Sequence, residues 1–375
     1  MIYIIAILAI LFVVLTFKVI SQTRKIINKN RGTEEDSEYL GAADSANNFN
    51  AAALLIFWIL AVVGTTWSYI HYSQYFLPEA SSVHGRETDF WFWVSMGIIT
   101  VAFFLVNTFL FLFSYVYRYS KQRKSAFYTH NNTLEIIWTT VPAVVMTGLV
   151  LSGLVVWNKI TGEAPEDAEV IEITGRQFAW MVRYSGEDGE FGKSNYKLMD
   201  DGSGNPLGLD FADANSFDDF SNSTELHIPK GKPVLLKIKA RDVLHSVFIP
   251  HMRVKMDAVP GMPTKFWFIA DKSTAEMKAA LNDSEFDYEI ACTEICGKSH
   301  FGMRMVLKVD EPEEYEKWKR EQKPVLTLNP DLLVNVPENL KARALKYIET
   351  EAPAAEAATD STAAPVAAVA AVETK

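Results

Sequence analysis

Two cysteines, a histidine and a methionine lie within twelve residues of one another, near the end of a stretch rich in strand-forming residues. They are Cys292, Cys296, His300 and Met303, in the run C-T-E-I-C-G-K-S-H-F-G-M, and the 375 residues contain no other cysteine. Thiolate and thioether sulfur are soft ligands that favour copper, and imidazole also suits copper. The run therefore predicts a copper site.

Two other uses of the cysteine pair stay open at this point. A disulfide between residues four apart closes a short ring, whereas a disulfide stabilises most when it closes a long loop. A structural zinc ion takes four tetrahedral ligands, usually cysteine and histidine, and Met303 would be a poor fourth ligand. Copper is the interpretation that gives Met303 a role.

A fifth candidate ligand, His245, is a polar interruption in the predicted strand at 241–250, which ends in proline. A lone histidine in such a stretch is more often structural than a ligand. However, His245 precedes Cys292 by about fifty residues. That separation is typical of a cupredoxin, where one histidine comes from an early strand and the others from a loop between the last two strands.

Several motifs closely resemble subunit 2 of cytochrome c oxidase, which carries the dinuclear copper A centre. They are the cysteine run, D-V-L-H-S at 242–246, M-D-A-V-P-G at 256–261, T-L-E-I-I-W-T-T-V-P-A at 133–143 and G-R-Q-F-A-W at 175–180. The resemblance extends from about residue 88 to about residue 325. The copper A domain of nitrous oxide reductase shares the metal spacing, but it is soluble and lacks membrane helices.

The resemblance implies a copper ligand set. Cys292 and Cys296 would bridge two copper ions, and His245 with Met303 would complete one of them. His300 would bind the other ion. Two bridged ions share one unpaired electron, so bond lengths change little on reduction. Met303 would be a weak axial ligand that tunes the potential.

Glu294, between the cysteines, has two implied roles. Its backbone carbonyl would complete the second copper ion, and its carboxylate would bind a magnesium ion shared with subunit 1. Magnesium takes hard oxygen ligands, and one glutamate cannot form such a site alone. A solvated loop carboxylate is the alternative. Asp242, three residues before His245, is a candidate for orienting its imidazole.

Three further residues have implied roles. Glu135, at the start of the last apolar segment, would mark the entrance of a proton channel into subunit 1, although the helix dipole alone favours an acid there. Many relatives have tryptophan as the first aromatic residue after G-x-Q, where electrons arrive from cytochrome c. Here Phe178 takes that place, and Trp180 follows. Both are candidates for electron uptake, and Trp180 fits the protein core better.

The fold class predicted is an α+β membrane protein with four N-terminal transmembrane helices. Each helix needs about 20 apolar residues to cross a hydrocarbon core of about 30 Å. The family has two such helices, so two are extra here. The first could instead be a cleaved signal peptide, but it lacks a basic start and a small-residue cleavage site. The four apolar segments are 2–20, 52–72, 91–117 and 134–157.

Basic residues predict the orientation of these helices, because basic loops stay in the cytoplasm. The linker between the second and third segments contains a single basic residue, Arg86. The first and third linkers are therefore cytoplasmic, and the N-terminus and the copper domain lie on the periplasmic side of a bacterial cell membrane. The basic residues of the first and third linkers are Lys18, Arg24, Lys25, Lys29, Arg31, Arg118, Lys121, Arg123 and Lys124.

Beyond residue 157, alternating residues predict a cupredoxin-like antiparallel β-sandwich or barrel with Greek-key connections. An acidic, Gly-rich and Asn-rich insertion at 185–223 is expected to be a surface loop, and the Ala-rich stretch from about residue 351 a disordered tail. No C-x-x-C-H motif for a c-type haem is present. The predicted strands are 170–174, 177–184, 224–229, 233–240, 243–249, 265–270, 286–291 and 304–309.

The predicted domains are 1–87 (two extra helices), 88–160 (helical hairpin), 161–325 (copper domain) and 326–375 (C-terminal extension). The predicted function is electron uptake for cytochrome c oxidase: copper A would pass electrons to haem in subunit 1, where oxygen is reduced to water with proton translocation. A quinol oxidase subunit 2, which is a scaffold without copper, and a copper-delivery or storage protein are the alternatives.

The predicted partners are subunit 1, other oxidase subunits, membrane lipid and an electron donor, with no nucleic acid. The donor is a c-type cytochrome or the donor domain of a fixed quinol-oxidising complex. The outer domain has many carboxylates between Glu163 and Glu225, and an acidic face would steer a basic donor, although acidic residues also keep a surface soluble.

Overall fold

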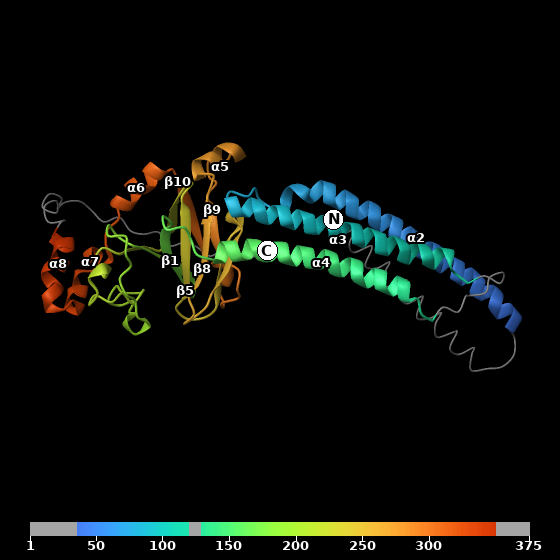
Figure 1. Cartoon of the computed structure of the whole chain (residues 1–375), viewed down its shortest axis with the longest axis horizontal. Helices are drawn as coiled ribbons and strands as arrows, with labels where there is room; N and C mark the ends of the chain where they lie inside the picture. The colour runs from blue at the N-terminus through green and yellow to red at the C-terminus, as the bar shows by residue number, and fades with distance from the viewer. Residues whose placement is uncertain (1–35, 120–128, 350–375) are drawn as a thin grey trace, which may run out of the picture. The chain divides into compact units, whose positions relative to one another are not determined.

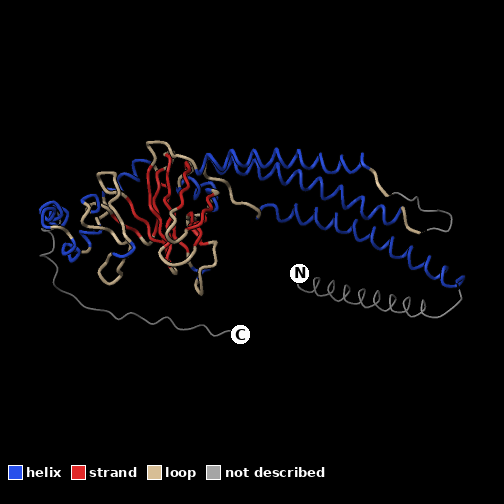
Figure 2. The backbone as a smooth tube through the Cα atoms, turned by 60° about the horizontal axis from the view of Figure 1, so that its bottom comes forward, coloured by secondary structure: helices blue, strands red, loops and turns tan. Residues whose placement is uncertain are grey.

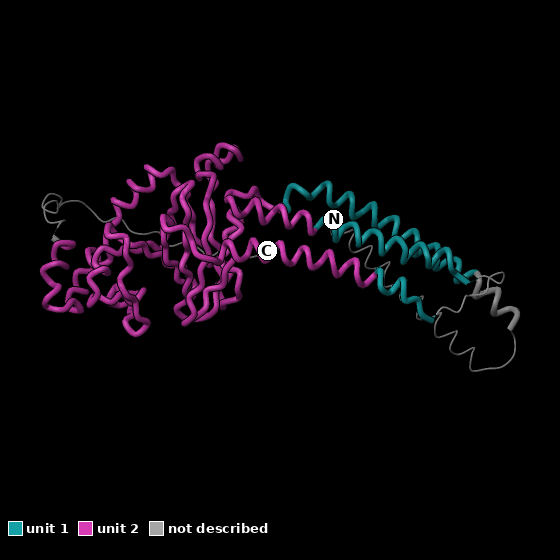
Figure 3. The backbone as a smooth tube through the Cα atoms, viewed as in Figure 1, with its two compact units in different colours: residues 1–76, 96–137 teal, residues 77–95, 138–375 magenta. Residues whose placement is uncertain are grey.

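The computed structural model describes residues 36–119 and 129–349 of the chain (Figure 1). Contacts divide the chain into two compact units (Figure 3). One unit comprises residues 1–76 and 96–137, and the other comprises residues 77–95 and 138–375. The second unit contains the β domain and the candidate metal centre.

Three long helices form the N-terminal part of the described chain: α2 (Asp36–Tyr72), α3 (Val83–Val116) and α4 (Asn132–Thr161). Within the described ranges, three spans are long and apolar enough to cross a membrane, at 45–75, 83–116 and 132–161. They contain the predicted segments 52–72 and 134–157 and nearly all of 91–117. The first predicted segment, 2–20, lies outside the described residues, so a count of four helices stays a prediction.

In the first unit, helix α2 packs against α3. The Trp58 ring stacks on Phe111 at 5.4 Å between centroids, and its indole N–H donates to the Thr108 hydroxyl at 3.2 Å. Arg118 donates to the Asn48 side chain at 2.7 Å. Packing contacts and interhelical hydrogen bonds are what associate helices within lipid. Helix α2 is therefore attached to α3 by ring stacking and by hydrogen bonds.

The β domain consists of two five-stranded sheets (Figure 2). The first has the order β3-β2-β1-β5-β8 and the second the order β4-β10-β9-β6-β7. All eight predicted strands overlap observed ones. The bounds are β1 (Glu169–Arg176), β2 (Ala179–Tyr184), β3 (Phe220–Asn222), β4 (Glu225–Pro229), β5 (Pro233–Ala240), β6 (His245–Ile249), β7 (Val254–Ala258), β8 (Thr264–Ile269), β9 (Tyr288–Cys292) and β10 (Arg304–Asp310).

Alternation along the strands builds the core of the domain, because successive side chains point to opposite faces of a sheet. In β9, for example, Tyr288, Ile290 and Cys292 are buried and the two residues between them are not. Strands β3 and β7 were missed by the sequence analysis. The first has only three residues, and β7 reads V-K-M-D-A, with two charged residues on its open face.

The sandwich is present as predicted, but two of its strand pairs differ from the antiparallel arrangement that was expected. Strand β1 runs parallel to β5, and β10 runs parallel to β4. The chain crosses from the second sheet to the first between β4 and β5. A strand reached by such a crossing is not joined to its neighbour by a hairpin, so a parallel direction is allowed.

The outer ends of α3 and α4 are tied to the β domain by polar contacts within the second unit. Arg253 binds Asp89 in two contacts, at 2.7 and 2.8 Å. Lys159 pairs with Glu87 at 2.9 Å, and its carbonyl accepts the Trp267 indole N–H at 2.7 Å. The position of the end of α4 against the first sheet is thus fixed by specific bonds.

The remaining helices are short: α5 (Thr274–Leu281), α6 (Pro312–Arg320), α7 (Val325–Leu328) and α8 (Glu338–Glu349). A second hydrophobic core, called here the insertion core, joins the 185–223 insertion to α7 and α8. Phe211 and Phe217 of the insertion pack with Leu326 and Ala344, and all four are buried. The last 26 residues, 350–375, lie outside the described residues, and so does most of the third linker.

Candidate metal centre

The metal centre forms where two neighbouring strands meet a loop. Strand β6 begins at His245, and β9 ends at Cys292. The two strands pair antiparallel with Val247 opposite Cys292, which brings His245 beside the loop 293–303. The Cys292 N–H donates to the Met303 carbonyl at 3.1 Å and closes that loop. The sheet therefore collects ligands that lie far apart in the sequence.

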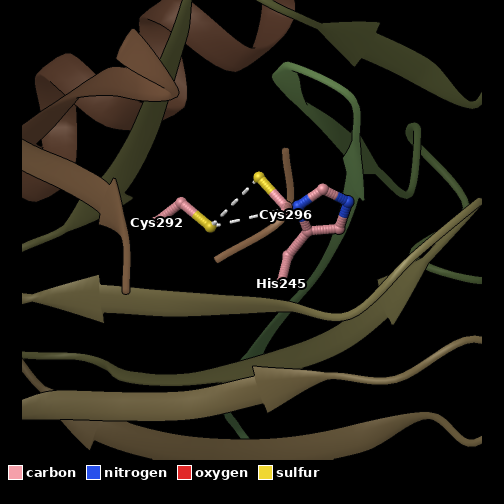
Figure 4. A group of neighbouring side chains, drawn as sticks. All are labelled: His245, Cys292 and Cys296. Atoms are coloured by element: carbon pink, nitrogen blue, oxygen red, sulfur yellow. Dashed lines mark hydrogen bonds between the residues drawn. The ribbon is translucent and has the colours of Figure 1, made fainter. Parts of the chain in front are cut away.

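Five side chains from β6, β9 and this loop converge at the site. The Cys292 sulfur lies 3.9 Å from His245 Nδ1 and 4.0 Å from the Cys296 sulfur (Figure 4). The Cys296 sulfur lies 3.6 Å from His300 Nδ1 and 3.9 Å from the Met303 sulfur. The ligand atoms of His245, Cys292 and Cys296 all lie within 4.8 Å of one another. These distances are short enough for shared metal ions.

The donor set suits copper. Both cysteines are free and buried, and their sulfurs are about twice as far apart as the ~2.05 Å of a disulfide. Burial, and then the nearby Cys292, raise the pKa of Cys296 to about 11. Two thiolates this close repel each other, and a cation between them would remove that repulsion. Metals are bound by this deprotonated form of cysteine. Soft sulfur and imidazole donors favour copper among the common metals.

Glu294 faces the site through its backbone. Its carbonyl oxygen lies 3.3 Å from the Cys292 sulfur, while its side chain is partly exposed. The main chain can therefore serve the metal centre while the carboxylate stays accessible to another group.

A hydrogen-bonded chain behind the ligands holds His245. Its Nε2 lies 2.8 Å from Asp242 Oδ1, so Nδ1 is left to face the sulfur. Asp242 Oδ2 accepts the Gln177 N–H at 2.7 Å, and the Gln177 side chain donates to the Cys296 carbonyl at 2.5 Å. Burial tends to raise the pKa of Asp242, but bonds from the Gln177 N–H, His245 and the Val243 N–H hold it below its usual value.

Gln177 was not recognised by the sequence analysis as part of the site. The signal was its place in G-R-Q-F-A-W, directly before the aromatic residue expected to lie near copper. Its role depends on a contact with Cys296, 119 positions away, and a pattern in a single sequence does not reveal such a contact.

The two aromatic candidates occupy different places. Trp180 is 1% exposed and packs edge-on against His245, with 6.0 Å between ring centroids. Phe178 is partly buried and covers the metal loop at Gly297. A Cβ atom at Gly297 would come within 3.0 Å of the Phe178 ring, and its φ of 143° also favours glycine. Trp180 belongs to the core, and Phe178 lies against the loop that carries the ligands.

Glu135 belongs to a different part of the chain. It lies exposed in the first turn of α4, and Asn131 caps this turn by accepting the Leu134 N–H at 3.0 Å. It is not among the residues that form the metal centre.

Two sequence models of known domains match the chain. The model described as "Cytochrome C oxidase subunit II, transmembrane domain" matches residues 70–156, and "Cytochrome C oxidase subunit II, periplasmic domain" matches residues 170–310. The chain is also 30% identical over 267 residues to the alternative cytochrome c oxidase subunit 2 of Bradyrhizobium diazoefficiens, covering 71% of this chain and 84% of the relative. The chain belongs to the cytochrome c oxidase subunit 2 family.

A second relative agrees with this assignment. Cytochrome c oxidase subunit 2 of Cereibacter sphaeroides is 30% identical over 251 residues, covering 64% of this chain and 76% of the relative. The solved periplasmic domain of subunit II of cytochrome oxidase from Bradyrhizobium japonicum is 22% identical and covers 42% of this chain and 95% of that domain, at a TM-score of 0.29. The family assignment rests on the sequences.

Family membership gives the broad role of the chain. Subunit 2 takes up electrons for a haem-copper oxidase embedded in a membrane. The match to the periplasmic-domain model assigns the β domain to the outer side of that membrane, and the apolar helices are its membrane part.

Proposed function

We propose that this chain takes electrons from a donor protein outside the membrane and delivers them, through a dinuclear copper A centre, to haem in subunit 1. The observation that carries the proposal is the convergence of both cysteines with His245, His300 and Met303 within 4.0 Å contacts. In the proposed enzyme, oxygen is reduced to water in subunit 1, and the reaction is coupled to proton translocation.

The proposed ligand set assigns each donor atom. The thiolates of Cys292 and Cys296 would hold both ions, His245 Nδ1 and Met303 would bind one, and His300 Nδ1 with the Glu294 carbonyl would bind the other. When bound, the two copper ions share a single electron, so uptake and release need little rearrangement. The set contains every donor expected from the sequence, and all of the side chains except His300 are buried.

The surrounding residues keep the donors in place during electron uptake. Asp242 fixes the ring of His245 through Nε2, and Gln177 holds the carbonyl of Cys296. Groups that orient metal ligands in this way commonly affect metal affinity by 10–100-fold. Phe178 and the buried Trp180 exclude water from this side of the site. Phe178, closer to the surface, is the better candidate for the contact with an electron donor.

The exposed side of the loop is proposed to contact subunit 1. Ile295 and Phe301 are 84% and 86% exposed, which is unusual for large apolar side chains beside a buried site and fits a protein interface. In the same loop, the partly exposed carboxylate of Glu294 would share a magnesium ion with subunit 1, because magnesium prefers oxygen ligands.

Two proposals concern the membrane part. Glu135, exposed at the start of α4, would mark the entrance of a proton channel into subunit 1, because an ionisable residue at a membrane boundary suits that role. The basic linkers support an N-terminus outside the cytoplasm and a multi-pass arrangement in a bacterial cell membrane.

The donor is proposed to be a c-type cytochrome or the donor domain of a fixed quinol-oxidising complex. The observation that favours a specialised donor is Phe178, since tryptophan occupies this place in many relatives. A gently solubilised oxidase that migrates with a quinol-oxidising complex would support the fixed partnership, and migration without it would count against the partnership.

Copper content and electron paramagnetic resonance test the main proposal on the full chain purified in detergent and loaded with copper. Two copper ions per chain and a seven-line hyperfine pattern are expected. One ion with a four-line pattern would contradict the shared-electron centre. Absence of tightly bound copper would favour the scaffold role of a quinol oxidase subunit 2.

A further inference from the structure

A hollow of about 570 Å³ lies between the end of α4 and the first sheet of the β domain. Helix α4 contributes one wall, strands β5 and β8 contribute the opposite wall, and the segment before β8 closes one side. The principal lining residues are Trp157, Thr161, Lys237, Lys239, Pro263 and Lys265. No acidic residue of the described chain lines this hollow.

The three lysines differ in their partners. Lys239 pairs with Glu172 at 2.7 Å. Lys237 and Lys265 stand directly opposite each other on β5 and β8, and within the residues described neither forms an ion pair. Lys237 has only the face of the Phe191 ring, 5.4 Å away. Like charges directly opposite on neighbouring strands destabilise a sheet. An anion bound between the two ammonium groups would therefore offset the repulsion between Lys237 and Lys265.

The position of the hollow identifies the source of such an anion. Helix α4 is a candidate membrane span that ends at Thr161, and tryptophan is enriched where a span leaves the membrane. Trp157 and Thr161 are four residues apart and share one helix face. The same face continues inward through Leu154 and Val150, which are 49% and 62% exposed. One face of α4 thus borders the charged hollow at Trp157 and Thr161 and continues as an exposed apolar stripe at Leu154 and Val150.

We infer that this hollow binds the headgroup of an anionic phospholipid from the outer leaflet. The phosphodiester lies between the ammonium groups of Lys237 and Lys265, and one acyl chain runs along Trp157, Leu154 and Val150. A free phosphate ion would use the lysines but not this stripe, whereas a phospholipid uses both. The site is independent of the copper ligands, and it anchors the β domain at the membrane surface beside α4.

The test uses the intact oxidase that contains this chain, exchanged into nanodiscs of phosphatidylglycerol or phosphatidylcholine. Lipid that stays bound is counted by native mass spectrometry. The wild type is expected to retain one more phosphatidylglycerol than the Lys237→Gln/Lys265→Gln variant, whose affinity at this site should fall at least tenfold. Phosphatidylcholine should show no such difference. Lys341→Gln, which removes an exposed charge on α8, is the matched control and should behave as the wild type.

Further measurements keep the outcomes distinct. Copper content and its resonance spectrum report folding of the β domain in each variant, separately from lipid binding. Lys265→Arg keeps the charge and should keep the lipid. If the double variant does not assemble, the single Lys265→Gln variant, which changes an exposed residue, replaces it in the lipid-binding test. An unchanged phosphatidylglycerol count, displacement of the lipid by millimolar inorganic phosphate, or loss of subunit 1 in place of lipid would each overturn the inference.

Discussion

The metal centre and the insertion core are both parts of the β domain, and both join segments that are far apart in the sequence. The metal centre gathers soft donor atoms from β6, β9 and one loop around a single point. The insertion core gathers apolar side chains from the insertion, α7 and α8 over the outer face of β2. A buried arginine, Arg183, fastens it with bonds to Glu172, Asp219 and the Gly192 carbonyl.

This difference separates function from stability. In the metal centre each donor atom has one role, so a single substitution removes a ligand that no neighbour can replace. In the insertion core many apolar contacts share the stabilisation, whereas in the arginine network one change removes a specific buried charge. Substitutions in the two regions should therefore affect different measurements.

The largest effect is expected from Cys296→Ser in the metal centre. Serine removes one bridging sulfur, and its hydroxyl is a poor ligand for copper. Electron transfer from donor to haem should fall by more than the ~10–100-fold typical of groups outside the ligand set. Stopped-flow reduction of the oxidase measures this, and the thermal midpoint should change little. Lys298→Gln, in the same loop and exposed, is the control, and a variant with near-normal electron transfer would contradict the bridging role.

Asp219→Ala makes the opposite test in the insertion core. It leaves the Arg183 guanidinium buried without one of its carboxylates, which typically costs about 3–5 kcal/mol. Since 1 kcal/mol shifts the midpoint of a domain this size by about 2–4 °C, the thermal midpoint should fall by roughly 10 °C. The copper spectrum should not change.

The control for this second test is Glu187→Ala, which changes an exposed acid of the same insertion. It should leave the thermal midpoint within a degree or two of the wild type. A changed copper spectrum in Asp219→Ala would show that the two regions are coupled.

The same difference explains what the sequence could predict. The four clustered ligands were recognisable because they lie within twelve residues and have unusual side-chain chemistry, and His245 was found from the family pattern. Eight strands were found because alternation is a local signal. The parallel pairs, Gln177 and the insertion core depend on contacts between distant segments. Arg183 looks like any other strand residue until Asp219, 36 positions later, is placed beside it.

A smaller effect is expected from Asp242→Asn. The amide keeps the size of the side chain but removes the charge that faces His245 Nε2. Copper affinity should fall by about 10–100-fold, measured by competition with a copper chelator, while two ions are still bound at saturation. Asp257→Asn removes an exposed carboxylate from the neighbouring strand and should leave copper affinity unchanged. Equal losses in both variants would point to net charge instead of the orientation of His245.

The smallest effect is expected at His227, on the side of the domain where α6 leads to the insertion core. Its Nδ1 lies 2.6 Å from Asp310 and its Nε2 2.9 Å from Glu225, and its ring stacks on Trp318 with 4.1 Å between centroids. Burial tends to lower the pKa of His227, but the two carboxylates outweigh burial and raise it above its ordinary value.

A raised pKa in the folded state means that protonated His227 stabilises the fold fully below pH about 6.5, and that this contribution is lost as the pH rises through the folded value. The free energy of unfolding of the wild type should therefore fall more than that of His227→Gln between pH 6 and pH 9, by a difference of about 1 kcal/mol, the size of one hydrogen bond. His251 is a control with the opposite pH dependence, because burial and Arg253 lower its pKa. Protonation of His251 at acid pH should destabilise the wild type, and His251→Gln should not show this loss of stability. If His227→Gln follows the wild type over this pH range, then the charge of His227 does not stabilise the sheet through Asp310 and Glu225, and the contribution of His227 rests on the ring stacking with Trp318.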